Sequence, residues 1–374
     1  FAGSIKANAG ANGGDGGFVE VSGKDTLVFK GSADTRAPQG KTGMLLLDPA
    51  NIIIANGSGD STADGDALTT SFSGAPSGTT GTVVAGDNPV GGTLTLFESE
   101  LEGIAATTNI SLAATAAITI NNLTDNNLDL AQTGGNSVSF NSATFAMSAG
   151  DTITTAGGAV NITTTGVATI AGLNTGGGAI TLNVGGVSTV GGVVAGVGTS
   201  LTKQGVGTLT LSGANTYTGT TTVNAGTLTL GASNVLANGT SVVVNGGTLA
   251  TGAFSDTVAG VQLLSGSITG TTGILTSTSD YDLQSGTVSA RLAGAVGLNK
   301  TTTGTVTLSG TGTNTYTGAT TVQQGVLLLA KATALGTAAG ATTVNAGAAV
   351  HLQGGIAVSE SITLNGTGVA NDGA

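Results

Sequence analysis

The fold is decided by the stretch LTKQGVGTLTLSGANTYTGTTTVNAGTLTL, residues Leu201–Leu230, because the chain repeats it. The second copy, Leu298–Leu329, reads LNKTTTGTVTLSGTGTNTYTGATTVQQGVLLL. The offset between the copies is 97 residues at the start and 99 residues after the NTYTG segment. The two extra residues fall near Thr311–Thr313, and we expect a loop there, since an insertion within a strand would disrupt its pairing.

A finer period of about 20 residues runs through the chain. The pattern VNAGTL at Val223 recurs as VNGGTL at Val244, and GAVNI at Gly158 recurs as GAITL at Gly178. Each unit carries short alternating segments such as Thr208–Leu211, which place apolar residues on one face and polar residues on the other. No such segment can bury its apolar face alone, whereas stacked coils align these residues into an interior column.

The sequence therefore predicts an all-β fold, a right-handed parallel β-helix (solenoid) with about 20 residues per coil. A β-sandwich also uses short alternating strands, but it shows no self-similarity at this period.

Composition narrows the function classes. Gly contributes 66 residues, charged residues only 8%, and the formal net charge is −11. With nine Lys and Arg residues, the chain lacks the basic footprint that nucleic-acid binding needs. It has no Cys, which excludes disulfides and thiolate ligands, and no apolar run long enough to span a membrane. Because it starts at Phe1 and stops within its pattern, we expect an internal fragment of a larger protein.

One helical signal interrupts the strands. Ser99–Glu102 has capping-box spacing, which predicts a short helical turn near residues 100–106. The preceding stretch is rich in Gly, Ser, Thr and Asp, which is typical of a loop or an insertion. The predicted organisation is β-helix coils over 1–55, a loop over 56–100, coils over 101–200, and coils over 201–374 that contain the repeat units 201–249 and 298–355.

The residues resemble two groups of exported bacterial proteins. The opening, with Phe1–Ile5, Gly16–Gly23 and Gly40–Pro49, resembles filamentous haemagglutinin-like exoproteins of two-partner secretion. The two copies that begin at Leu201 and Leu298 resemble the autotransporter-associated β-strand repeat of passenger regions.

This resemblance implies a β-helical protein that is secreted or exposed on the bacterial surface, with an outer-membrane barrel transporter as its export partner. It implies the shaft or binding surface of an adhesin that attaches to host cells, surfaces or other cells through a glycan or protein receptor. A purely mechanical spacer and a β-helical polysaccharide-acting enzyme are the alternatives. Exposed β-edges also predict self-association.

Few residues are candidates for a site, and the sequence predicts no catalytic residue, cofactor or metal. Tyr217 and Tyr316 occupy matching repeat positions, where exposed rings could stack on sugars or, alternatively, pack on the neighbouring coil. His351 lies in an alternating segment and is expected to face outward.

Two further groups have a chemical and a structural interpretation. Asp280, Asp282, Arg291 and Lys300 could form a paired-carboxylate or cation site, or a polar turn between coils. Gly13–Gly17 resembles one calcium-binding turn, but such turns occur in tandem, which favours a plain tight turn.

Overall fold

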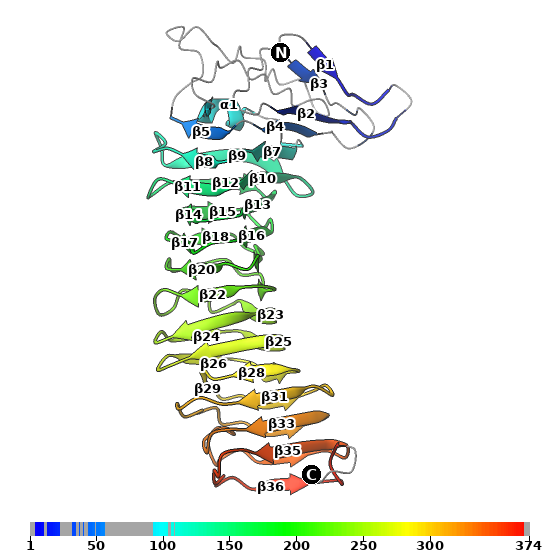
Figure 1. Ribbon diagram of the computed structural model, residues 1–374, viewed down its shortest axis with the longest axis vertical. Coiled ribbons are helices and arrows are strands. Elements are labelled where there is room, and N and C mark those ends of the chain that lie inside the picture. The colour runs from blue at the N-terminus through cyan, green and yellow to red at the C-terminus, as the bar shows by residue number, and fades with distance from the viewer. Residues whose placement is uncertain are drawn as a thin grey trace. The chain divides into compact units, whose positions relative to one another are not determined.

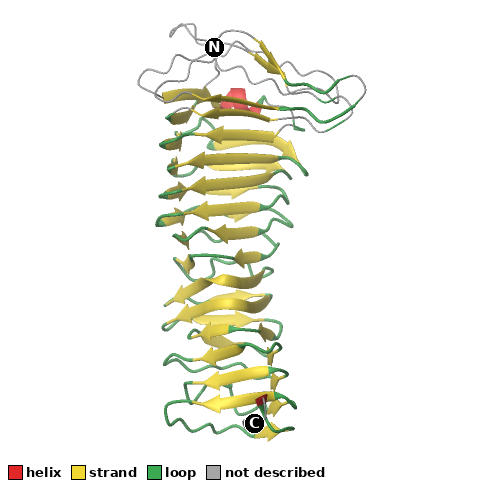
Figure 2. Ribbon diagram, turned by 45° about the vertical axis from the view of Figure 1, so that its right-hand side comes forward, coloured by secondary structure: helices red, strands yellow, loops and turns green. Residues whose placement is uncertain are grey.

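The computed structural model describes residues 4–10, 13–22, 32–34, 37, 40, 44–48, 50–56, 93–103, 106–107 and 109–369. The chain forms two compact units, Phe1–Thr199 and Ser200–Ala374. Strands dominate both units (Figure 2). The described residues contain no helix that is long and apolar enough to cross a membrane.

The first unit winds three strands into each full coil, so that its strands form three parallel stacks (Figure 1). The first stack contains β7 (Asn109–Ala113), β10 (Ser137–Ser142), β13 (Ala159–Thr164) and β16 (Ile180–Val184). The second contains β8 (Ala117–Ile120), β11 (Thr144–Met147), β14 (Ala168–Ile170) and β17 (Ser188–Val190). The third contains β9 (Asn127–Thr133), β12 (Thr152–Ala156), β15 (Gly172–Asn174) and β18 (Val194–Ala195).

The first two stacks extend toward the N-terminus. On the first, β4 (Met44–Asp48) pairs with both β2 (Phe18–Ser22) and β7. On the second, β5 (Asn51–Ala55) lies between β6 (Thr93–Phe97) and β8. A separate pair joins β1 (Ser4–Lys6) to β3 (Ser32–Asp34).

Most of the predicted loop over 56–100, residues 57–92, lies outside the described residues. Its last residues are not a loop: Thr93–Phe97 is strand β6, and helix α1 spans Glu98–Glu102. The predicted helical turn exists, although it begins two residues earlier and ends four residues earlier than expected.

The second unit has two continuous stacks. The first contains β19 (Leu201–Gln204), β21 (Thr221–Val223), the starts of β23 (Ser241–Gly252) and β25 (Gly260–Gly270), β27 (Tyr281–Leu283), β30 (Leu298–Lys300), β32 (Thr320–Val322), β34 (Thr342–Val344) and β36 (Ile362–Leu364). The second contains β20 (Thr208–Leu211), β22 (Thr227–Leu230), the ends of β23 and β25, β28 (Gly286–Val288), β31 (Thr305–Leu308), β33 (Gly325–Leu329) and β35 (Ala348–Leu352).

The third side of the second unit is a sheet in only part of its length. It contains β24 (Asp256–Val258), β26 (Ile274–Ser277) and β29 (Arg291–Ala293). In both repeat copies the third side is irregular backbone that carries the NTYTG segment. The two-residue insertion near Thr311–Thr313 lies on this irregular side, where the sequence predicted a loop.

The register shows the period directly. Val160 pairs with Ile180 and Leu201 pairs with Thr221, both 20 residues apart. Along β20 the Leu side chains are buried and the Thr side chains are half-exposed, and the same alternation recurs in strand after strand. The predicted parallel β-helix with an apolar interior column is therefore confirmed.

Candidate functional site

The two repeat tyrosines are buried. Tyr217 and Tyr316 have no solvent-exposed area, and their hydroxyls lie 2.6 Å and 2.8 Å from the Oγ1 atoms of Thr221 and Thr320. The prediction that they contact a ligand is wrong, because the NTYTG segment turns its ring into the coil rather than onto the surface. The alternative interpretation, a ring packed within the stack, describes both residues.

The asparagines of the same segment connect neighbouring coils. Asn314 is fully buried: its Nδ2 donates to the carbonyl of Ala334 at 2.7 Å, and its Oδ1 accepts from the backbone N–H of Leu292 at 3.0 Å. Asn215 takes the matching position and donates to the carbonyl of Val235 at 2.6 Å. Because a buried carbonyl without a partner is costly, these amides hold one coil to the next.

Sequence reasoning did not predict that the repeat lysines are buried, and it did not single out Lys203 at all. Lys203 and Lys300 occupy matching repeat positions and have no exposed area. The Nζ of Lys203 donates to the carbonyls of Gln204 at 2.7 Å, Gly205 at 2.8 Å and Ala225 at 3.2 Å. Each ammonium thus satisfies carbonyls at the corner between the first two stacks. The sequence contains a signal for this burial. Side chains alternate between the two faces of a strand, so Lys203 lies on the same face as the buried Leu201.

These buried groups predict an unusual dependence of stability on alkaline pH. Burial lowers the pKa of Lys203 and of Lys331 to about 8, whereas an unfolded lysine titrates near 10.4. Between these values the unfolded chain binds more protons, so the free energy of unfolding should rise with pH. Burial raises the pKa of Tyr217 and Tyr316, so above pH ~10 the unfolded chain loses protons first and stability should fall.

We therefore expect the melting temperature, followed by circular dichroism from pH 7 to pH 12, to pass through a maximum near pH ~10. The rise should be smaller in a Lys203→Met variant, which lacks one of the titrating groups. A melting temperature that falls steadily from pH 8 would contradict the burial of these lysines.

The charged cluster that the sequence offered for catalysis is a set of coil contacts. Gln262 and Thr301 donate to the carboxylate of Asp282 at 2.6 Å and 2.7 Å. Although burial would raise the pKa of Asp282, these hydrogen bonds, one from Gln284 and the nearby Lys300 charge hold it below its ordinary value.

The other members of the cluster bind backbone. The Asp280 carboxylate accepts from the N–H of Gly297 at 2.7 Å, and Arg291 donates to the carbonyl of Thr272 at 3.1 Å. All four side chains therefore have structural partners, as the polar-turn interpretation predicts.

The remaining candidates also have structural positions. His351 lies in β35 and is exposed, as predicted. Within Gly13–Gly17, Gly13 and Gly14 have positive φ, and the N–H of Gly13 donates to the carbonyl of Gly10 at 3.2 Å. Within the described ranges, no group of three or more His, Cys, Asp or Glu residues is arranged to hold a metal ion.

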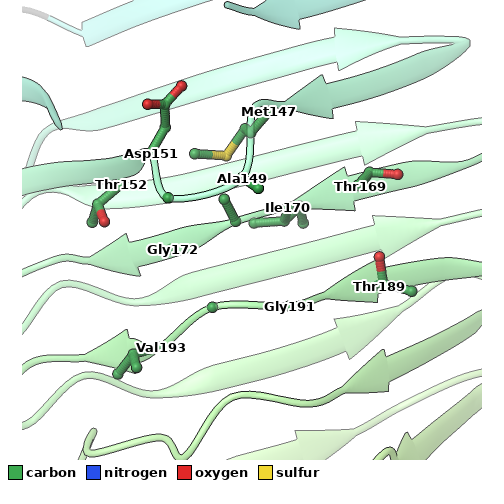
Figure 3. Close-up of a pocket in the computed structure, with 13 residues that line it drawn as sticks. Met147, Ala149, Asp151, Thr152, Thr169, Ile170, Gly172, Thr189, Gly191 and Val193 are labelled. Atoms are coloured by element: carbon green, nitrogen blue, oxygen red, sulfur yellow. The ribbon is translucent and has the colours of Figure 1, made fainter. Parts of the chain in front are cut away.

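The first unit contains a groove of about 530 Å³ at the corner between its second and third stacks (Figure 3). Unequal turns create it. Four residues separate β11 from β12, one residue separates β14 from β15, and three residues separate β17 from β18. At this corner the turn of the middle coil is therefore shorter than the turns of the coils on either side. The groove is lined by Met147, Ala149, Gly150, Asp151, Thr152, Thr169, Ile170, Ala171, Gly172, Thr189, Gly191, Gly192 and Val193.

The groove presents hydroxyl and apolar groups rather than charge. Thr169, Thr189 and Val193 are exposed on it. Asp151 is its one charged residue, but this side chain is buried and its carboxylate points away from Val193 in Figure 3, toward the N–H of Leu123, which donates to it at 3.3 Å. Burial raises the pKa of Asp151. The groove is therefore suited to an uncharged ligand.

Comparison with known protein families identifies the repeat. Residues 201–230 and 298–329 each match the family model of the passenger-associated-transport-repeat. The chain carries the repeat of autotransporter passengers. No curated protein and no solved structure matches it. Together with the parallel solenoid, the repeat fits an autotransporter passenger, which implies export to the cell surface or secretion and an outer-membrane export partner.

Proposed function

We propose that this chain is the shaft and binding surface of an exported bacterial adhesin, and that the autotransporter route is its path of export. The observation that carries the proposal is the inward position of the distinctive repeat residues. Lys203, Asn215 and Tyr217, with their counterparts in the second copy, are all buried and bonded to coil backbone or Thr hydroxyls. The repeat thus builds a stiff stack and leaves the outer faces free for contact with a receptor.

The outer faces suit attachment by many weak contacts. They carry Thr, Ser and Asn side chains on many of the coils, and repeated groups of one kind support multivalent binding. The groove of the first unit adds one concave place at which an uncharged glycan or an uncharged stretch of protein could be held.

We expect a Thr189→Arg variant to lose binding by about tenfold or more, because a long cationic side chain would fill the groove. Thr181→Arg is the matched control, since Thr181 is half-exposed on the neighbouring stack, outside the groove. The measurement is saturation binding of labelled protein to a panel of host cells and immobilised glycans. Equal losses in both variants would contradict a role for the groove.

The same panel separates the alternatives. Saturable binding without release of sugar supports the adhesin. A protein that binds nothing on the panel is a mechanical spacer, and release of reducing sugar would identify a polysaccharide-acting enzyme. The Asp280 and Asp282 carboxylates, which would have to act in such an enzyme, already accept hydrogen bonds within the coils.

A further inference from the structure

The ends of four strands in the second stack of the first unit lie along one edge. Strands β6, β5, β8 and β11 are neighbours in this order and run parallel, so the residues that follow them meet at the same edge of the sheet. These residues are Glu98 after β6, Asn56 after β5, the turn 121–126 after β8 and the turn 148–151 after β11. Polar side chains that are far apart in the sequence are thereby brought together.

Three side-chain oxygen atoms converge at this edge. The Oγ1 of Thr124 lies 3.1 Å from the Oε1 of Glu98 and also contacts the Oδ1 of Asn56. A hydroxyl has a single proton, so Thr124 can donate to only one of these two acceptors. The three residues follow three different strands and are at least partly exposed, so the oxygen atoms form a small group that solvent reaches.

Asp151 brings a buried carboxylate to the same edge. Its side chain has no exposed area, and its Oδ1 accepts from the N–H of Leu123, the residue before Thr124, at 3.3 Å. In Figure 3 the carboxylate points away from Val193, toward the coil that contains Leu123. The Oδ2 of Asp151 is also buried, and it forms no hydrogen bond with any described residue. A buried carboxylate oxygen without a partner is costly, and a bound cation would remove that cost.

The charges around this edge are negative. Burial raises the pKa of Glu102 and of Asp151. The negative charges of Glu98 and Asp125 raise both pKa values further, and Asp129 adds a third negative charge beside Glu102. In the part of the chain that the structure describes, no Lys or Arg offsets these charges at either carboxyl group. The edge therefore attracts a cation.

We propose that this strand edge binds one calcium ion, with oxygen ligands from Asn56, Glu98, Thr124 and Asp151. Two of these ligands are a neutral amide and a hydroxyl, which agrees with the absence of three acidic ligands at one place among the described residues. Water completes the shell on the exposed side of Asn56 and Thr124. Bound in this way, the ion connects the ends of four strands and offsets the repulsion between their carboxylates.

The kind of ligand favours calcium over other common cations. Calcium takes about six to eight oxygen ligands from carboxylates, amide carbonyls and water, in a flexible geometry that suits side chains from separate turns. Magnesium demands a near-ideal octahedron and usually keeps several of its waters. Transition metals prefer imidazole or thiolate ligands, and neither His nor Cys is present among these residues.

The test is equilibrium dialysis of the whole chain against radioactive calcium after treatment with a chelator. The wild-type protein should bind one ion per chain with a Kd of about 10⁻⁴–10⁻³ M, the range of extracellular calcium modules. Asp151→Asn should lower the affinity about tenfold or more, because the amide keeps an oxygen for the N–H of Leu123 but loses the charge. Glu98→Gln should show a similar loss. Asp129→Asn is the matched control, since it removes an exposed carboxylate of the same edge that is not a ligand, and it should change the affinity less than about threefold.

Hydrogen exchange separates a bound ion from general screening of charge. Calcium chloride should slow exchange in the turn 121–126 more than sodium chloride of equal ionic strength does, and this difference should be absent in Asp151→Asn. Circular dichroism confirms that each variant is folded before the comparison.

Three results would overturn the proposal. The wild-type protein would bind no calcium, or Asp151→Asn and Asp129→Asn would bind it equally well, or sodium chloride would slow exchange as much as calcium chloride. The last result would mean that salt only screens the like charges. None of these measurements involves a receptor, so the adhesin proposal stands or falls separately.

Discussion

Replacing Asn314 by alanine is expected to lower the local free energy of opening by about 3–5 kcal/mol. The Asn314 amide satisfies the N–H of Leu292 and the carbonyl of Ala334, and its Oδ1 also accepts from the Nζ of Lys331 at 2.8 Å. Alanine would remove this partner from all three groups. Lys331 would keep the carbonyl of Gly312 at 3.0 Å, and the carbonyl of Ala334 would keep only a long hydrogen bond from the Tyr316 hydroxyl at 3.5 Å. Hydrogen exchange of the amides in β29 and β31 measures the effect.

Two comparisons make this prediction specific. Asn238→Ala changes an exposed asparagine on the same side of the solenoid and should leave exchange unchanged. Adding Lys331→Met to Asn314→Ala removes the stranded ammonium, so the double variant should be less destabilised than the sum of the single variants. Exchange in Asn314→Ala that matches Asn238→Ala would mean that the amide does not hold the coils together.

The strands could be predicted because their physics is local. The alternation along Thr208–Leu211 predicts which side chains face inward, and the 20-residue period predicts which strands pair. Segments such as Leu298–Lys300 were predictable for the same reason. The buried lysine at its end lies on the apolar face by the same rule, so its position was readable although lysine is rarely buried.

The repeat tyrosines could not be placed by that rule. Tyr217 lies on the irregular third side, where no period of two applies and backbone turns decide the direction of a side chain. Strand β6 was missed for a different reason. Composition over the long stretch before Thr93 is dominated by Gly, Ser, Thr and Asp, and this hides a five-residue strand whose partner, β5, lies some forty residues earlier.

The groove is a property of several coils at once. The groove exists because the turn at Ala171 is shorter than the turns above and below it, so no single turn predicts it. The exact register is a further example, since Thr208, Thr227 and Thr248 share one register although their spacings are 19 and 21 residues, which the sequence alone does not fix. Pairing between coils supplies this information.

Replacing Gly226 by alanine is expected to destabilise its coil by more than about 3 kcal/mol. Gly226 has φ +61°, where an L-residue costs about 1–2 kcal/mol, and an added Cβ would collide with the carbonyl oxygens of Gly205 and Gly207. Those oxygens are backbone atoms that cannot rotate away, and the Gly205 carbonyl also accepts from Lys203 at 2.8 Å. The clash would therefore displace the corner that this buried lysine stabilises.

Limited proteolysis at low temperature reports the effect, because a displaced corner exposes the chain between β20 and β22. Gly239→Ala is the matched control, since a Cβ there meets no atom within 4 Å. Gly325 occupies the corresponding position in the second copy, with φ +66° and the same collision with the carbonyl of Gly304, so Gly325→Ala should be cleaved between β31 and β33. If Gly226→Ala resists cleavage as well as Gly239→Ala does, the coil accommodates a side chain at this corner. The close approach of successive coils would then not depend on a glycine with positive φ at this position.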